Sequence, residues 1–423
     1  MARFALALAL LLGGLVSAQP DTYFVPIAAR TPTTSPVGPT GLKTTLWLPD
    51  PGVGADQALL FASDTTTTVP FLLGTSSPAS VSNFPSTATA VATAPGVNVA
   101  GSSRTLVAVA GGGLVTFGTI ESGAWVSRGP SIGTIPSDGR MALSATPGGG
   151  AALLTTEGFN ITRYDLDASS GQVVATQGLS MPAAPNGSLD EANALLFDGT
   201  TNLGFVGGRS LGDLYTFNAN LDAGRPSLFD PGIAVGTGRL GPPISGLAAY
   251  VGQQAHYLLV ANLVGITVYD LTLPNPLPSA FRVVPQDSVG PIIPASGGVA
   301  VTNLPAGTPL PQGVIAVGDV TQKGLALVRW DILAGMVDGG LVIDPDFDPR
   351  GDGGLPDGGG LPDGGGGNDG GCSGCAPPPP NFPIGPPVPV DHGSSCSTAA
   401  SGPALLGALV GLLLLLPRRR QRR

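Results

Sequence analysis

Short apolar segments recur along residues 22–343, and clusters of Gly, Asp, Asn, Ser or Thr bound each of them. Apolar runs of about four to eight residues between turn-forming residues are typical of buried β-strands. No long segment follows the helical period. The pattern therefore predicts strands over residues 58–63, 105–109, 151–155, 203–206, 257–261 and 314–317.

A second set of segments alternates apolar and polar residues, and each follows one of the apolar segments after a turn. These segments predict partner strands over residues 114–117, 161–164, 213–217, 266–269 and 325–330. The pair recurs about every 50 residues, a period that suits four-stranded blades. We therefore predict an all-β body over residues 19–343 that forms a six-bladed β-propeller. The alternative that these strands allow is a pair of β-sandwiches.

The N-terminus has the pattern of a secretory signal peptide. Arg3 precedes an apolar run over residues 4–16, and small residues lead up to Ala18. The run is too short to span about 30 Å of hydrocarbon. We expect cleavage between Ala18 and Gln19, so residues 1–18 are absent from the mature protein.

Residues 344–393 lose the strand pattern and become rich in Gly, Asp and Pro. This composition predicts a linker, flexible in its glycine half and stiffer in its proline half. Four acidic residues of this region are spaced as in a calcium loop, but Leu355 stands where an EF-hand needs glutamate. Cys372 and Cys375 form a single CxxC, for which a local disulfide is the simplest interpretation.

The C-terminal 30 residues, 394–423, combine Cys396, an apolar segment over residues 402–416 and five arginines after it. The arginines hold the end of a membrane-inserted helix on the cytoplasmic side. This arrangement resembles the myxobacterial C-terminal sorting domain (MYXO-CTERM type). The resemblance implies a sorting protease as partner, processing and anchoring at Cys396, and a location at the cell surface or outer membrane of a Gram-negative bacterium. An ordinary single-pass anchor is the alternative.

Charge excludes one class of partner. The chain has 423 residues, only 11% of them charged, and a net charge of −9. Such a chain offers no basic surface for nucleic acid. The three cysteines all follow residue 370 and one histidine, His256, lies in the body, so neither a disulfide framework nor a histidine-based metal site is expected there.

The order of segments in the body resembles the β-propeller phytases. Residues 45–51 with 59–64 resemble the opening strand pair of that family, residues 245–250 with 257–270 its central blade, and residues 310–317 with 327–334 its last. The resemblance implies a calcium-dependent hydrolase of phytate or other phosphate monoesters. In such a site carboxylates hold calcium and cationic side chains bind phosphate.

Most residues that this chemistry needs are different here. Leu42 and Lys43 stand where the family has paired acids, Ser245 replaces another acid, and residues 295–297 replace an acidic turn. Glu191 alone matches an acidic position of the family and is the predicted calcium ligand. Seven aspartates are further ligand candidates, although aspartate in a strand-rich chain is usually a turn residue: Asp56, Asp64, Asp138, Asp190, Asp198, Asp287 and Asp319.

Two functions remain open at this point. The first is a surface-anchored, phytase-like phosphatase, which accounts for the scaffold but lacks most metal ligands. The second is a non-catalytic surface propeller that binds a ligand or a protein partner. Three or more carboxylates at one mouth of the channel would favour the first.

Overall fold

The computed structural model describes residues 22–350 with internal gaps. The gaps are residues 32–41, 51–53, 134–139, 147, 159, 168–169, 171, 181–190, 210–211, 219–226, 229–242, 254, 273–278, 286–292, 296, 321, 323, 338–339 and 349. The predicted signal peptide, the CxxC pair and the C-terminal sorting signal with its helix over residues 402–416 lie outside the described residues. Within the described part, no helix is long and apolar enough to cross a membrane.

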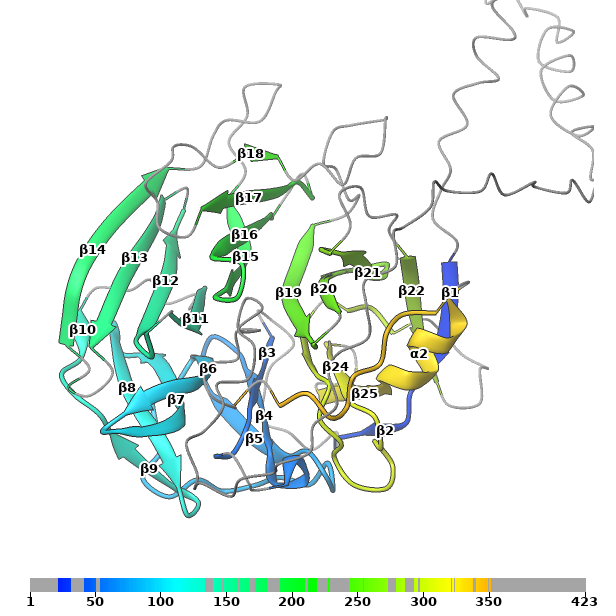
Figure 1. Cartoon of the computed structure of the whole chain (residues 1–423), viewed down its shortest axis with the longest axis horizontal. Coiled ribbons are helices and arrows are strands. Elements are labelled where there is room, and N and C mark those ends of the chain that lie inside the picture. Colours follow the sequence, from blue (N-terminus) through cyan, green and yellow to red (C-terminus); the bar gives the residue numbers. More distant parts are fainter. Residues whose placement is uncertain are drawn as a thin grey trace, which may run out of the picture. The chain divides into compact units, whose positions relative to one another are not determined.

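Six β-sheets are arranged around a common centre, as Figure 1 shows. Blade 1 consists of β3 (Lys43–Trp47), β4 (Leu59–Ser63) and β5 (Thr68–Leu72). The 3₁₀ turn η1 (Ala55–Gln57) lies between β3 and β4. Blade 2 consists of β6 (Ala90–Val99), β7 (Ser102–Gly111), β8 (Leu114–Glu121), β9 (Ala124–Ser127) and β10 (Ile132–Gly133). Blade 3 consists of β11 (Met141–Ala145), β12 (Ala151–Glu157), β13 (Asn160–Asp167) and β14 (Gln172–Ser180).

The other three blades continue the ring in chain order. Blade 4 consists of β15 (Ala192–Asp198), β16 (Leu203–Gly208), β17 (Leu214–Asn218) and β18 (Ser227–Leu228). Blade 5 consists of β19 (Ile244–Val251), β20 (His256–Asn262), β21 (Gly265–Asp270), β22 (Ser279–Val284) and, from the N-terminus, β1 (Thr22–Pro26). Blade 6 consists of β23 (Val299–Thr302), β24 (Val314–Asp319), β25 (Gly324–Arg329) and β2 (Ala29–Arg30).

The predicted six-bladed propeller is confirmed. In five blades the apolar and alternating segments found in the sequence are the second and third strands, for example β12 and β13. These strands carry the strongest pattern because blades cover both of their faces. The β-sandwich alternative is wrong, since six separate sheets surround one centre.

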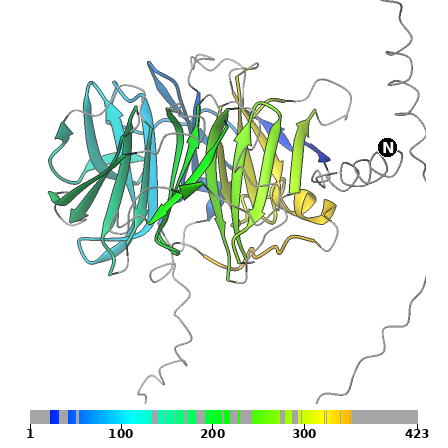
Figure 2. The ribbon, with the colours of Figure 1, turned by 90° about the horizontal axis from the view of Figure 1, so that it is seen from above.

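The first strands of the six blades form the inner ring: β3, β6, β11, β15, β19 and β23. Each contacts the next, and β23 contacts β3, so the ring is closed. Figure 2 shows the blades edge-on, with strands of neighbouring blades side by side.

The hydrophobic core is divided among the six junctions between blades. Each of the six buried clusters combines side chains from two adjacent blades. The junction of blades 5 and 6 is centred on Trp330, which is fully buried and stacks on Tyr250 with 4.4 Å between ring centroids. Burial of this kind is the main stabilising contribution in a body without disulfides.

The two N-terminal strands of the body complete the last two blades. The N-terminal β2 pairs antiparallel with β25, and β1 pairs in parallel with β22. Residues from the beginning of the body therefore complete sheets formed by its end, which fixes the ring without a covalent link.

After β25 the chain forms the short helix α2 (Trp330–Met336) and then a C-terminal strap, residues 340–348 and 350. In Figure 2 the strap runs along one face of the propeller. Its contacts continue as far as Arg350, seven residues beyond the predicted domain boundary after Ile343. That boundary, like the others, stays a prediction.

Candidate functional site

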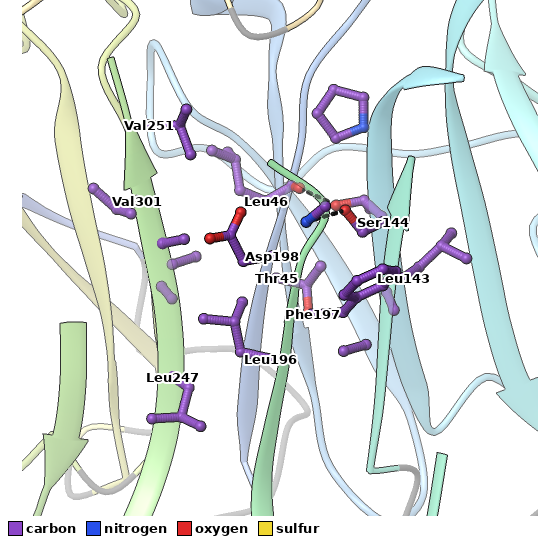
Figure 3. Close-up of a pocket in the computed structure, with 18 of the residues that line it drawn as sticks. Thr45, Leu46, Leu143, Ser144, Leu196, Phe197, Asp198, Leu247, Val251 and Val301 are labelled. Atoms are coloured by element: carbon purple, nitrogen blue, oxygen red, sulfur yellow. Dashed lines mark hydrogen bonds between the residues drawn. The ribbon is translucent and has the colours of Figure 1, made fainter. Parts of the chain in front are cut away.

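The inner ring encloses a cavity of about 290 Å³ that all six inner strands line. Figure 3 shows Leu46, Leu196, Val251 and Val301, which come from four inner strands, around this cavity. Aliphatic side chains dominate the wall. Asp198 is the only charged residue among the described residues that line it.

Hydrogen bonds join each inner strand to its neighbour. Thr45 Oγ1 donates to Val91 O over 2.8 Å, and Thr93 Oγ1 donates to Leu46 O over 2.6 Å, which links blades 1 and 2 in both directions. Side chains make such bonds at four more junctions: Gly199 N to Ser144 Oγ, Asn193 Nδ2 to Ile244 O, Ser245 Oγ to Ala295 O and Thr44 Oγ1 to Gly297 O. Between blades 2 and 3 the bond is a main-chain one, from Asn98 N to Gly149 O in the turn before β12. The inner strands would otherwise leave main-chain groups of an open sheet edge unpaired. These polar side chains therefore close the inner edges of the blades.

Asp198 lies at the end of β15 and is 3% exposed. Its Oδ1 accepts hydrogen bonds from Thr200 N and Thr200 Oγ1, and its Oδ2 accepts one from Thr201 Oγ1. His256 Nε2, on β20 of the next blade, is 2.8 Å from the same Oδ2. Both carboxylate oxygens are therefore occupied within the protein.

The pKa of Asp198 reflects opposing effects. Burial raises the pKa of this carboxyl, but the contact with His256 and the two threonine hydroxyls outweigh burial and lower it below its usual value. Asp198 is therefore a stable anion in the wall and not a proton donor at neutral pH.

Three other aspartate candidates are described: Asp56 is exposed in the 3₁₀ turn η1, and the other two act as structural residues. Asp64 Oδ1 accepts hydrogen bonds from Thr66 N and Thr67 N, which makes a turn after β4. Asp319 pairs with Arg30 over 2.7 Å and accepts from Gln322 N after β24. Both are buried, consistent with the turn role of aspartate at strand ends. Asp138, Asp190 and Asp287 lie outside the described residues.

The positions matched to acidic groups of the phytases do come together in space. A β-carbon at Gly298 would lie 3.3 Å from Thr44 N, 3.8 Å from Lys43 Cα and 3.9 Å from Ser245 O. Ser245 and Thr44 also donate to main-chain carbonyls of Ala295 and Gly297. We call this set of residues (42–45, 245–246, 295 and 297–298) the neutral junction, because it contains no carboxylate. It joins the starts of β3, β19 and β23.

The residues of the neutral junction do not fit a calcium ion. Calcium needs six to eight oxygen ligands, with carboxylates among them, whereas the side chains here are those of Leu42, Lys43, Thr44 and Ser245. Space is also lacking, because a β-carbon on Gly246 would lie 2.5 Å from Gly298 Cα. Gly298 itself has a φ of +84°, which favours glycine.

Glu191 lies directly before β15 and is exposed. Its Oε2 is 3.0 Å from Nη1 of Arg209, so its charge is balanced within its own blade. Among the described residues, no group of three or more His, Cys, Asp or Glu side chains is placed to hold a metal. Calcium binding by Glu191 therefore stays a prediction, and Cys396 and Ala18–Gln19 lie outside the described residues.

Comparisons with known proteins give only distant similarity. No protein-family model matches the chain, and no curated protein matches it. Among solved structures, the chain is similar to the extracellular domain of a one-component system of B. thetaiotaomicron, with 14% identity, a TM-score of 0.37, and coverage of 64% of this chain and 32% of that one. The chain thus spans about a third of that protein.

Two further solved structures are propellers. The Dos1 propeller has 13% identity and a TM-score of 0.34, and the match covers 68% of this chain and 66% of that one. The Cps50 (Swd1) β-propeller domain of Myceliophthora thermophila has 11% identity and a TM-score of 0.37, and the match covers 72% of this chain and 99% of that one. The strand topology described above, and not these similarities, establishes the fold.

Sequence reasoning located the neutral junction but missed the hydrogen bonds between inner strands. Thr45, Thr93 and Asn193 look like ordinary polar residues in half-buried strands. Their only signal is a polar side chain within a strand whose neighbours are apolar.

Proposed function

We propose that this chain is an exported, surface-anchored β-propeller that binds a ligand or partner and does not hydrolyse phosphate esters. One observation carries the proposal: the neutral junction, where the resemblance implies a calcium site, has no room for an ion. Ser245 and Thr44 donate their hydrogen bonds to main-chain carbonyls there, and its glycines pack tightly. A phosphate ester carries dense negative charge and needs cations to neutralise it.

Export and anchoring belong to the same proposal. They rest on the N-terminal apolar run before Ala18, and on Cys396 followed by an apolar segment and arginines. In this proposal the sorting protease acts on the tail, and the propeller is displayed outside the cell.

A phytase-like phosphatase is the second candidate. One observation favours it: residues 43–44, 245 and 298, at or beside positions where the resemblance implies acidic groups, lie close together. That meeting supports common descent with the phytases. Activity would depend on Glu191 and on acidic residues outside the described part of the chain.

The deciding measurement is phosphate release from phytate by the purified full-length chain, with calcium and with a chelator. We expect no release and no rise in melting temperature on addition of calcium. Calcium-dependent release that is lost in Glu191→Gln would overturn the proposal.

A matched variant tests the neutral junction itself. In Ser245→Asp a carboxylate would face the carbonyl oxygen of Ala295, so we expect a lower melting temperature in chelator. If calcium raised the melting temperature of this variant above that of wild type, the junction would still be able to form a calcium site.

A further inference from the structure

The central cavity has the size and lining of a small-molecule site. Its volume of about 290 Å³ is just below the range of roughly 300–1,000 Å³ that is usual for ligand pockets, so it suits a small ligand. Leu46, Leu196, Val251 and Val301 are partly exposed to it and lie around it in Figure 3. A ligand in this cavity would bury apolar surface against four strands at once, which is the main source of affinity in such pockets.

Several polar side chains of the wall are already used within the protein. Thr45 and Thr93 donate to carbonyls of the neighbouring strand, and Ser144 accepts from Gly199 N. Asp198 accepts from Thr200 and Thr201 and contacts His256. A charged ligand would lose its hydration in the cavity and find little compensation, which is costly.

The wall is also held in place before any ligand arrives. Hydrogen bonds from the inner strands to the adjacent blade, present at all six junctions, fix the spacing of the blades around the cavity. The strap adds contacts at one rim, where Asn303 Nδ2 donates to Asp344 O over 2.8 Å. A pre-formed site loses less free energy to ordering when it binds.

We propose that the central cavity binds a small, uncharged and predominantly apolar molecule. The inference rests on the proposed binding function and names the class of ligand. The aliphatic wall supplies the affinity, and the internally satisfied polar groups select against charge.

The test uses 1-aminoanthracene, a neutral fluorescent probe, with the full-length chain. Val301→Trp places an indole in the cavity, so we expect probe affinity to fall at least tenfold. Leu114→Trp is the matched control, because Leu114 is 46% exposed on β8 and does not line the cavity. We expect wild type and Leu114→Trp to bind one equivalent with equal affinity.

Equal binding by all three proteins, or no saturable binding by wild type, would overturn the inference. Circular dichroism tests whether Val301→Trp is folded. If it is not, Leu196→Phe provides the same test from another strand. The anionic probe 8-anilinonaphthalene-1-sulfonate is expected to bind at least tenfold more weakly than the neutral probe, and tighter binding would contradict selection against charge.

The two proposals fail in different ways. Calcium-dependent phosphate release would contradict the proposed function, whether or not the probe binds. Absence of release together with absence of probe binding removes only the inference about the cavity, and leaves binding at another surface.

Discussion

At the scale of single residues, Asp198 is the buried charge on which the junction of blades 4 and 5 depends. It belongs to β15, and its partner His256 belongs to β20. A buried carboxylate that keeps its charge must receive hydrogen bonds or an ion pair. Asp198 receives three hydrogen bonds from its own turn and one contact from the next blade.

This environment predicts a specific dependence of stability on pH. Because the pKa of Asp198 is lowered in the folded state, its ionised form stabilises the fold above the unfolded pKa of about 3.9, and this stabilisation is lost as the pH falls through the folded value. Asp198→Asn lacks the contribution at every pH. We expect the difference in free energy of unfolding between wild type and Asp198→Asn to be largest at pH 7 and to shrink below about pH 4.

Urea unfolding between pH 7 and pH 3 measures this difference. Asp270→Asn is the control, because Asp270 makes the same turn with Thr272 at an exposed position and contacts no other blade through an ion pair in the described structure. A difference for Asp198→Asn that stayed constant across this range would contradict the assignment.

At the scale of elements, the C-terminal strap connects four blades. Asp344 N donates to Tyr250 Oη over 2.9 Å in blade 5, and Asn303 of blade 6 donates to two strap carbonyls. Arg350 donates to Pro49 O at the end of β3, and Ser103 Oγ of blade 2 donates to Arg350 O. The strap therefore connects blades 5, 6, 1 and 2 by hydrogen bonds.

Arg350 makes the strap's hydrogen bonds to blades 1 and 2. It is 5% exposed, and its Nη2 is 2.7 Å from Asp348. Burial raises the pKa of Asp348, but the hydrogen bonds and charge of Arg350 together outweigh burial and lower it below its usual value. We expect Arg350→Ala to reduce the free energy of unfolding by about 2 kcal/mol, as is typical for hydrogen bonds of charged groups, and to speed amide exchange at residues 341–348.

Arg329→Ala is the matched control for this prediction. Arg329 pairs with Asp331 near the protein surface, where an ion pair contributes at most about 1 kcal/mol. Chemical denaturation and hydrogen exchange of both variants test the strap. Equal effects of the two substitutions would mean that the strap contributes no more than a surface ion pair.

At the scale of the whole molecule, the ring closes because the N-terminal segment completes blades 5 and 6. β2 is only two residues long, and Arg30 holds it by an ion pair to Asp319, whose side chain is 3% exposed. Closure brings together residues that are nearly 290 positions apart in the chain. Such long-range contacts cost chain entropy and must be stabilised by specific contacts.

Arg30→Ala tests this closure. Loss of the ion pair to a buried carboxylate is expected to cost about 3 kcal/mol and to increase amide exchange first in β2 and β25. Arg209→Ala, which removes the exposed pair with Glu191, is the control and should change stability by less than about 1 kcal/mol. Uniform exchange throughout the ring of Arg30→Ala would contradict a local role in closure.

The sequence by itself determined the second and third strands of most blades and the number of blades. Apolar and alternating segments mark the second and third strands of the blades because neighbouring blades cover both faces, and a repeat of about 50 residues gives six units. It also indicated which segments depart from the phytase pattern, namely Leu42–Lys43, Ser245 and residues 295–297. These features are local in the chain, so a local pattern can carry them.

Only the tertiary structure decided how those segments are used. Ser245 and Thr44 donate hydrogen bonds to carbonyls on other blades, and Thr44 lies 253 positions from Gly297, its acceptor. The extent of the strap to Arg350 and the contact of Asp198 with His256 likewise depend on partners far away in sequence. A polar side chain in a strand can face solvent, a ligand or a neighbouring carbonyl, and its physical role is fixed only when the ring closes and supplies the partner.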